Sequence, residues 1–125
     1  MFQNISTILI WSSNWKKLAK WYEDTLNLKM VEEITHPKDT GRLFEFPGGK
    51  PWIWIGQHSK VKDRNKDKHR HMFNITTDSV DKTYEYLLKK KVKIIAKPFK
   101  APTFDKWFCT FEDADGNLLQ VIGPK

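Results

Sequence analysis

Aromatic side chains stand at alternate positions of one apolar segment, where they could bind a small molecule. Trp52 and Trp54 are two residues apart, and on a strand this spacing places both indoles on the same face. Indole rings stack on planar or cationic ligands. Because six tryptophans in 125 residues exceed what a small core requires, we expect an aromatic wall for a ligand. Packing in the core or in a dimer interface is the alternative, and Trp107 is a third candidate for the wall.

Two amide side chains interrupt apolar segments. Asn74 lies within the segment 71–77, and Gln120 lies between Leu119 and Val121. A buried amide needs a hydrogen-bond partner. For Gln120, which can both donate and accept, we expect that partner to be a ligand. For Asn74, a neighbouring backbone group is the simpler partner.

Few residues are suited to acid–base or metal chemistry. Glu45 would serve as a general base if it were buried, and a solvent-facing strand position is the alternative. His69 and His71 have the spacing that faces one way on a strand, and histidine pairs bind metals. Cys109 has no neighbouring histidine, so we expect a packed thiol and not a nucleophile.

A strand–helix unit occurs twice in the chain, about 65 residues apart. Asn14 and Ser79 are the expected N-caps of two amphipathic helices, 15–26 and 80–91. Alternation and turn residues predict eight strands around them: 5–11, 28–34, 42–46, 52–57, 71–77, 93–97, 106–112 and 117–122. The segments 35–41 and 98–102 are expected loops. The order predicts an α+β fold of two tandem βαβββ modules, whose strands form an eight-stranded mixed sheet with the helices on one outer face.

The bulk composition fits one domain over residues 1–125. Module one covers about 1–58, module two about 71–125, and a basic, solvated crossover 59–70 joins them. One cysteine and no visible leader or long apolar run predict a cytoplasmic protein with no membrane partner. The net charge of +7 permits anionic partners. Charge runs of this kind are usually solvated surface, so we do not expect nucleic-acid binding.

Three motifs resemble those of the vicinal oxygen chelate superfamily, which includes glyoxalase I, extradiol dioxygenases and bleomycin-resistance proteins. They are WYEDTLNLK at 21–29, FEFPGG at 44–49 and FEDADGNLLQ at 111–120. They occur in the family's order and on a duplicated frame. The resemblance covers nearly the whole chain and implies a cupped sheet whose concave face holds the ligand, and a homodimer with side-by-side or exchanged modules.

The resemblance also implies where a metal would be bound. Metalloenzymes of the superfamily use one side chain from each of strands one, four, five and eight. Those positions hold Thr7, Trp54 (to within one residue), Met72 and Gln120 in this chain. Indole nitrogen has no lone pair for a metal, and the other three side chains are neutral. We therefore expect no metal cofactor.

The resulting hypothesis is a glyoxalase/bleomycin-resistance-like protein that binds a small, neutral or anionic aromatic molecule without a metal. The expected cup residues are Thr7, Leu9, Trp11, Trp52, Trp54, Met72, Asn74, Trp107 and Gln120. The alternative is a lyase or dioxygenase that depends on a divalent metal held by displaced ligands, His71, Glu45 and Gln120. The sequence leaves open whether the protein is an enzyme.

Overall fold

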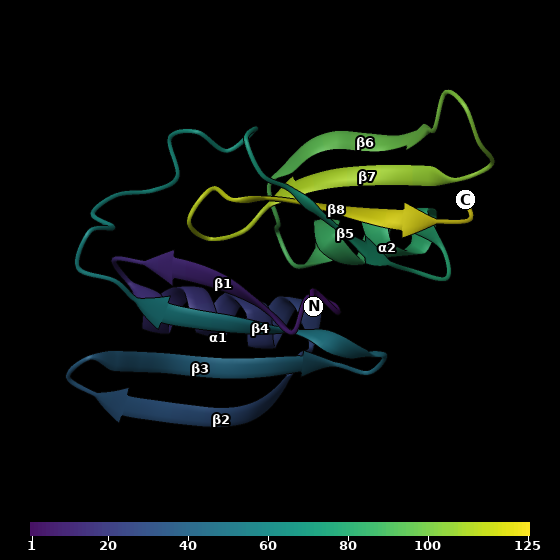
Figure 1. Ribbon diagram of the computed structural model, residues 1–125. Coiled ribbons are helices and arrows are strands. Elements are labelled where there is room, and N and C mark those ends of the chain that lie inside the picture. Colours follow the sequence, from purple (N-terminus) through teal and green to yellow (C-terminus); the bar gives the residue numbers. More distant parts are fainter. The chain divides into compact units, whose positions relative to one another are not determined.

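The computed structural model describes all residues, 1–125, and divides into two units, 1–64 and 65–125 (Figure 1). Each unit is a four-stranded mixed sheet with one helix against one of its faces. The expected α+β fold of two βαβββ modules is confirmed, but the eight strands form two four-stranded sheets and not the single eight-stranded sheet that was expected. No helix is both long enough and apolar enough to cross a membrane.

The first unit has the sheet order β1-β4-β3-β2. Strand β1 runs parallel to β4, and the other pairs are antiparallel. The elements are β1 (Thr7–Ser12), α1 (Trp15–Leu26), β2 (Lys29–His36), β3 (Asp39–Phe46) and β4 (Gly49–Gln57).

The second unit repeats this plan with the order β5-β8-β7-β6. Strand β5 runs parallel to β8, and the other pairs are antiparallel. The elements are β5 (Phe73–Thr76), α2 (Val80–Lys89), β6 (Ile94–Lys100), β7 (Trp107–Glu112) and β8 (Leu118–Gly123).

Each helix buries its apolar stripe on its own sheet. The helical period of 3.6 residues gathers Leu18, Ala19 and Tyr22 on one side of α1, and all three are fully buried. In the second unit, α2 buries Val80 and Leu87. The sheet residues that alternate toward the helices complete the two cores: Phe44, Ile53 and Ile55 in the first unit, and Cys109, Phe111, Leu119 and Val121 in the second.

The two helices begin differently. Ser79 caps α2 as expected: its hydroxyl accepts a hydrogen bond from the Lys82 N–H (3.3 Å) and donates one to the carbonyl oxygen of Lys125 (3.1 Å). Asn14 precedes α1, but the expected side-chain cap is wrong, because the Asn14 side chain makes no capping bond. Instead the Ser12 hydroxyl accepts the backbone N–H of Asn14 (3.0 Å).

Substituting Ser79→Ala should therefore lower the free energy of unfolding by about 1 kcal/mol, as for other lost N-caps. Urea denaturation measures this loss. Asn14→Ala is the matched control at the start of α1 and should cost clearly less, because no capping bond is removed. Equal losses in the two variants would contradict this assignment of the caps.

Two expected loops are shorter than predicted. Residues 35–41 are mostly strand, because β2 and β3 continue to a tight turn at Pro37 and Lys38. Pro98 lies inside β6 and not in a loop. Strand β6 is an edge strand, and its register shifts between Ala96 and Phe99. An edge position with a bulge accommodates a residue that has no N–H to donate.

The DADGN turn between β7 and β8 is held by its own side chains. The Asp113 carboxylate accepts the backbone N–H groups of Asp115 (2.8 Å) and Asn117 (3.0 Å), and Gly116 adopts φ +78°. The segment that begins at Asn65 is fastened to this turn. Asn65 donates its backbone N–H to the carbonyl oxygen of Asp115 (2.8 Å) and its side-chain amide to Asn117 Oδ1 (2.9 Å). These bonds explain why the second unit starts before its first strand.

Candidate ligand-binding faces

The first unit presents a row of aromatic and small residues on the sheet face opposite α1. The parallel register pairs Leu9 with Trp54 and Thr7 with Trp52. Paired residues of neighbouring strands share a face, whereas Ile53 and Ile55 point to the core. The expectation that Trp52 and Trp54 share one face, together with Thr7, Leu9 and Trp11, is confirmed.

Trp54 lies flat against the sheet. Gly41 and Gly56 are directly paired across β3 and β4. A Cβ atom on Gly56 would stand 2.3 Å from Trp54 Nε1, and one on Gly41 would stand 2.6 Å from the Trp54 ring. The two glycines therefore form a floor for the indole, which is only 6% exposed. Its Nε1 hydrogen is buried without a hydrogen-bond partner.

The other two tryptophans of this face are more open. Trp52 is half-buried, with Lys50 Nζ 5.4 Å from its ring centre. Trp11 is half-buried and meets the ring of His58 edge-on at 5.3 Å. Leu9 remains 55% exposed beside them. This face thus combines accessible aromatic and aliphatic surface with one nearby cation.

The second unit presents amide and hydroxyl groups on the sheet face opposite α2. Asn74 pairs with Gln120, and Gln120 pairs with Thr110 on the other side. The Gln120 side chain donates from Nε2 to Thr110 Oγ1 at 2.9 Å. Asn74 is exposed, so it does not need the buried partner that was considered for it. Met72 lies just before β5 and is 47% exposed.

Trp107 does not share this face, so its expected place beside Gln120 is wrong. The register pairs Trp107 with Gly123, on the same side as Cys109 and Phe111, which pack toward α2. Its ring is covered by the ammonium group of Lys125, 4.9 Å from the ring centre. The sequence contains a signal for this placement: Trp107 is spaced by two and four residues from Cys109 and Phe111, so it shares a strand face with two core residues.

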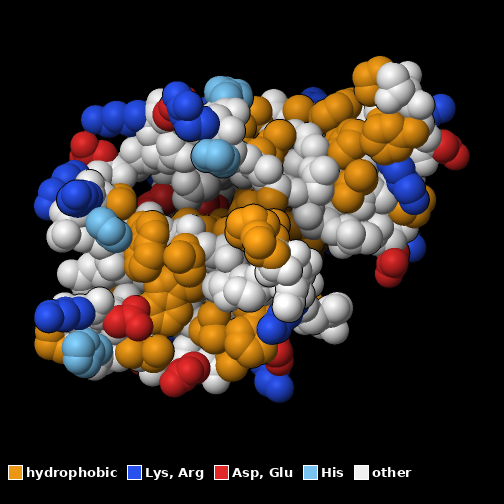
Figure 2. Space-filling model, in the orientation of Figure 1, with side chains coloured by type: hydrophobic (Ala, Val, Ile, Leu, Met, Phe, Trp, Pro, Cys, Tyr) orange, Lys and Arg blue, Asp and Glu red, His pale blue; other side chains and the backbone are white.

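Three phenylalanines occupy the place expected for Trp107, and the sequence reasoning missed them. Phe108 pairs with Phe99, and Phe108 alternates with Thr110 along β7, so both rings lie on the face of Gln120. The Phe108 and Phe99 ring centres are 5.6 Å apart, and Phe104 meets Phe108 edge-on at 6.0 Å. Figure 2 shows hydrophobic side chains gathered over the β6–β7 end of the second unit.

The two registers also show which positions of the modules are equivalent. Leu9 and Asn74 are equivalent in the duplication, and their strand partners are Trp54 and Gln120. Trp54 therefore stands in the first module where Gln120 stands in the second. The strand-four position of the resemblance, assigned only to within one residue from the sequence, is Trp54 by this internal comparison.

The side chains at the four family positions do not suit a divalent metal. Trp54 presents an N–H donor and no lone pair. Gln120 has its amide nitrogen turned to Thr110, and Thr7 and Met72 are neutral. Within either unit, no group of three or more His, Cys, Asp and Glu side chains is close enough to hold a metal ion.

The residues considered as displaced metal ligands or as a general base do not form a common site. His71 and His69 are exposed and precede β5, and His71 has the parity of core-facing Phe73. Glu45 is not buried: it pairs with Lys29 at 3.7 Å, and its side chain is 32% exposed. Cys109 is buried, and this burial raises the pKa of its thiol to about 11. A thiol of that pKa is protonated at neutral pH, as expected for a packing residue.

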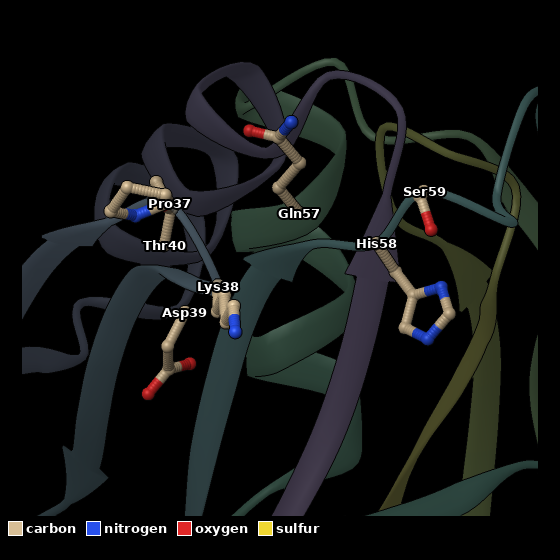
Figure 3. Close-up of a pocket in the computed structure, with 7 residues that line it drawn as sticks. All are labelled: Pro37, Lys38, Asp39, Thr40, Gln57, His58 and Ser59. Atoms are coloured by element: carbon tan, nitrogen blue, oxygen red, sulfur yellow. The ribbon is translucent and has the colours of Figure 1, made fainter.

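A polar pocket of about 260 Å³ lies in the first unit, between the β2–β3 turn and the end of β4 (Figure 3). It is lined by Pro37, Lys38, Asp39, Thr40, Gln57, His58 and Ser59. The side chains of Asp39, Gln57 and His58 point in different directions and not to a common centre. The pocket therefore lacks converging groups that would act on a ligand.

A chain built from two βαβββ modules, each with one sheet face turned away from its own helix, has the fold of the vicinal oxygen chelate proteins. A family model matches residues 4–121, and the chain belongs to the Glyoxalase/Bleomycin resistance protein/Dioxygenase superfamily. No curated protein matches the chain.

Several solved structures share the fold. A glyoxylase/bleomycin resistance protein/dioxygenase domain from Frankia sp. EAN1pec is 18% identical, with a TM-score of 0.82 and all of both chains covered. TnmS3, an antibiotic binding protein from a Streptomyces species, is 16% identical, with a TM-score of 0.78 over 99% of this chain and 98% of that one. The fosfomycin resistance protein FosX from Listeria monocytogenes is 16% identical, with a TM-score of 0.74 over 100% and 96%. At these low sequence identities, the comparisons show that the proteins share a fold.

Proposed function

We propose that this protein binds a small aromatic molecule on a sheet face opposite one of its helices and that it does so without a metal. The observation that carries the proposal is Trp54. An aromatic side chain lies flat on a glycine floor at the strand-four position, and its polar atom is a donor, not a metal ligand. Trp52 and Trp11 add accessible rings to the same face.

The chemistry of these faces favours stacking as the source of affinity. Pockets for small molecules are mostly apolar, with few polar groups that orient the ligand. Considered separately, the face of the first unit offers indole rings for stacking. The face of the second unit offers its own phenylalanine rings for stacking and the Gln120–Thr110 pair as an orienting group. Lys50 beside Trp52 and the net charge of +7 favour neutral or anionic ligands over cations. The relatives that are named as antibiotic-binding or resistance proteins support a binding role of this kind.

Substituting Trp52→Ala should weaken binding of an aromatic ligand about tenfold, because one stacking ring is lost. Isothermal titration with hits from a screen of neutral and anionic aromatic compounds measures the dissociation constant. Trp21→Phe on α1 is the control, because it also changes one tryptophan but lies on the helix. Failure of every compound to bind would refute the proposal, as would equal binding by wild type and Trp52→Ala.

A metal count distinguishes the proposal from the metal-dependent alternative. The protein is purified without a histidine tag, equilibrated with Mn, Fe, Co, Ni or Zn, dialysed, and its bound metal measured by mass spectrometry. We expect well under one metal per chain. A stoichiometric metal that is lost in a His71→Ala variant would instead support a lyase or dioxygenase with displaced ligands.

A further inference from the structure

One sheet face of the second unit changes character from end to end along β7. Phe108, Thr110 and Glu112 alternate onto the face opposite α2. Successive residues on one face of a strand are about 7 Å apart. The face therefore presents an aromatic group, a hydroxyl and a carboxylate in sequence, and each has a different environment.

The Glu112 end of the face is closed. Glu112 is only 3% exposed and forms ion pairs with Lys68 and with Lys93, the latter at 3.2 Å. Lys68 belongs to the segment that Asn65 fastens to the DADGN turn through Asn117. The protein's own chain covers this end of the face, and Lys68 and Lys93 neutralise the charge of Glu112.

The Phe108 end of the face is open. Phe99 and Phe104 are 39% and 50% exposed, although both contact the Phe108 ring. The loop that carries Phe104 is held by its backbone. Ala101 donates its N–H to the carbonyl oxygen of Lys106 (2.8 Å), and Lys106 donates to that of Phe104 (3.0 Å). This short, hydrogen-bonded loop therefore holds the Phe104 ring against Phe108, while about half of the Phe104 side chain remains exposed to solvent.

The middle of the face offers a hydrogen-bond acceptor. Gln120 uses its amide nitrogen to donate to Thr110. An amide has a carbonyl oxygen besides its NH₂ group, and that oxygen accepts hydrogen bonds. A ligand group placed here is best matched if it is a donor, such as a hydroxyl or an amine.

The charge beside the aromatic end is positive. Lys97 and Lys106 flank the aromatic end in sequence with a single acid, Asp105, whereas Lys100 pairs with Trp107 and so belongs to the other side of the sheet. Figure 2 shows lysine and arginine side chains beside the hydrophobic patch over β6 and β7. This surplus attracts anions to the open end.

We propose that the second unit binds an aromatic anion of one or two fused rings, which stacks on the exposed surfaces of Phe99 and Phe104 where these rings pack on Phe108. A hydrogen-bond donor on the far side of the ring reaches Gln120, one strand repeat along the face. This inference rests on the proposed function and adds a location and a ligand class to it. Phe104 acts as a specificity residue, because its loop decides the width of the aromatic end.

The test uses 6-hydroxy-2-naphthoate as probe and 2-naphthoate, which lacks the donor, as its matched analogue. Titrations follow naphthoate fluorescence with the full chain. We expect Phe104→Ala and Phe99→Ala each to weaken binding of both compounds about tenfold. Gln120→Leu should abolish the preference for the hydroxylated compound while the affinity for 2-naphthoate is kept. Leu88→Ala on α2, where the side chain is 48% exposed, is the control and should change nothing.

The outcomes separate this inference from the broader proposal. If wild type binds naphthoates and the Phe104→Ala and Phe99→Ala variants bind them as tightly as Leu88→Ala does, the inference is overturned. The Trp52→Ala titration then still tests the proposed function. If wild type binds neither naphthoate but binds other aromatic compounds, the ligand class is wrong and the binding role stands. Circular dichroism melting curves show that each variant is folded.

Discussion

Substituting Gly41→Ala is expected to lower the free energy of unfolding by roughly 3 kcal/mol or more, the range of severe overpacking in a buried site. A Cβ atom at Gly41 would lie 2.3 Å from the carbonyl oxygen of Ile55 and 2.7 Å from the Cα of Gly56. Both neighbours are backbone atoms of the paired strand, so a side-chain rotation cannot relieve the clash. Thermal unfolding should show a midpoint about 10 °C lower.

Two other glycines provide matched comparisons for Gly41→Ala. At Gly56 the nearest atoms belong to the Trp54 side chain, which can move. Gly56→Ala should therefore cost less than Gly41→Ala, and part of its cost should vanish in a Trp54→Leu background. A Cβ atom at Gly48 would have no neighbour within 4 Å, so Gly48→Ala should be close to neutral. Equal costs at Gly41 and Gly48 would refute the close backbone approach at Gly41. A Gly56→Ala cost that is unchanged in the Trp54→Leu background would refute the glycine floor beneath Trp54.

Substituting Glu112→Gln is expected to lower the free energy of unfolding at pH 7 by about 2 kcal/mol, because two lysines lose a buried counterion. The hydrogen bond from Lys68, with a smaller contribution from Lys93, lowers the pKa of Glu112 below its ordinary value of 4.5. Lys68 is the larger contributor, and the Lys93 side chain is 69% exposed. Lys68→Met should therefore destabilise the protein more than Lys93→Met.

The pH dependence of this effect has a definite sign. A carboxyl group whose pKa is lowered by folding stabilises the folded state fully above its unfolded pKa. That contribution is lost as the pH falls from about 4.5 through the folded value. The stability difference between wild type and Glu112→Gln should thus shrink in acid, as measured by urea denaturation from pH 7 to pH 3. A difference that is constant over this range would contradict the ion-pair explanation.

Strand alternation was sufficient to place most of the candidate residues on their faces. Within one strand, a spacing of two residues fixes which side chains share a face, whatever the strand's neighbours are. Trp52 with Trp54 was predicted correctly on this basis. The duplication then related the two modules, because a helix start and an apolar stripe recur at a constant offset. These are local properties, and the family motifs agreed with their order along the chain.

Alternation alone does not decide which face of one strand joins which face of another. Trp107 was expected beside Gln120, but its pairing with Gly123 places it on the opposite side. The bulge at Pro98 shifts the register of β6, and it brings Phe99 to the face of Phe108. A register shift of one residue moves every later side chain to the other face.

The sequence by itself determined the two βαβββ modules, their helices and the sharing of faces within each strand that has no bulge, because hydrophobic periodicity and turn residues act over short stretches of chain. Only the tertiary structure decided that Gly41 pairs with Gly56 under Trp54 and that Glu112 is buried between Lys68 and Lys93. Both arrangements join residues that are well separated in sequence. Their contacts depend on strand register and on the path of a loop, which no local pattern encodes.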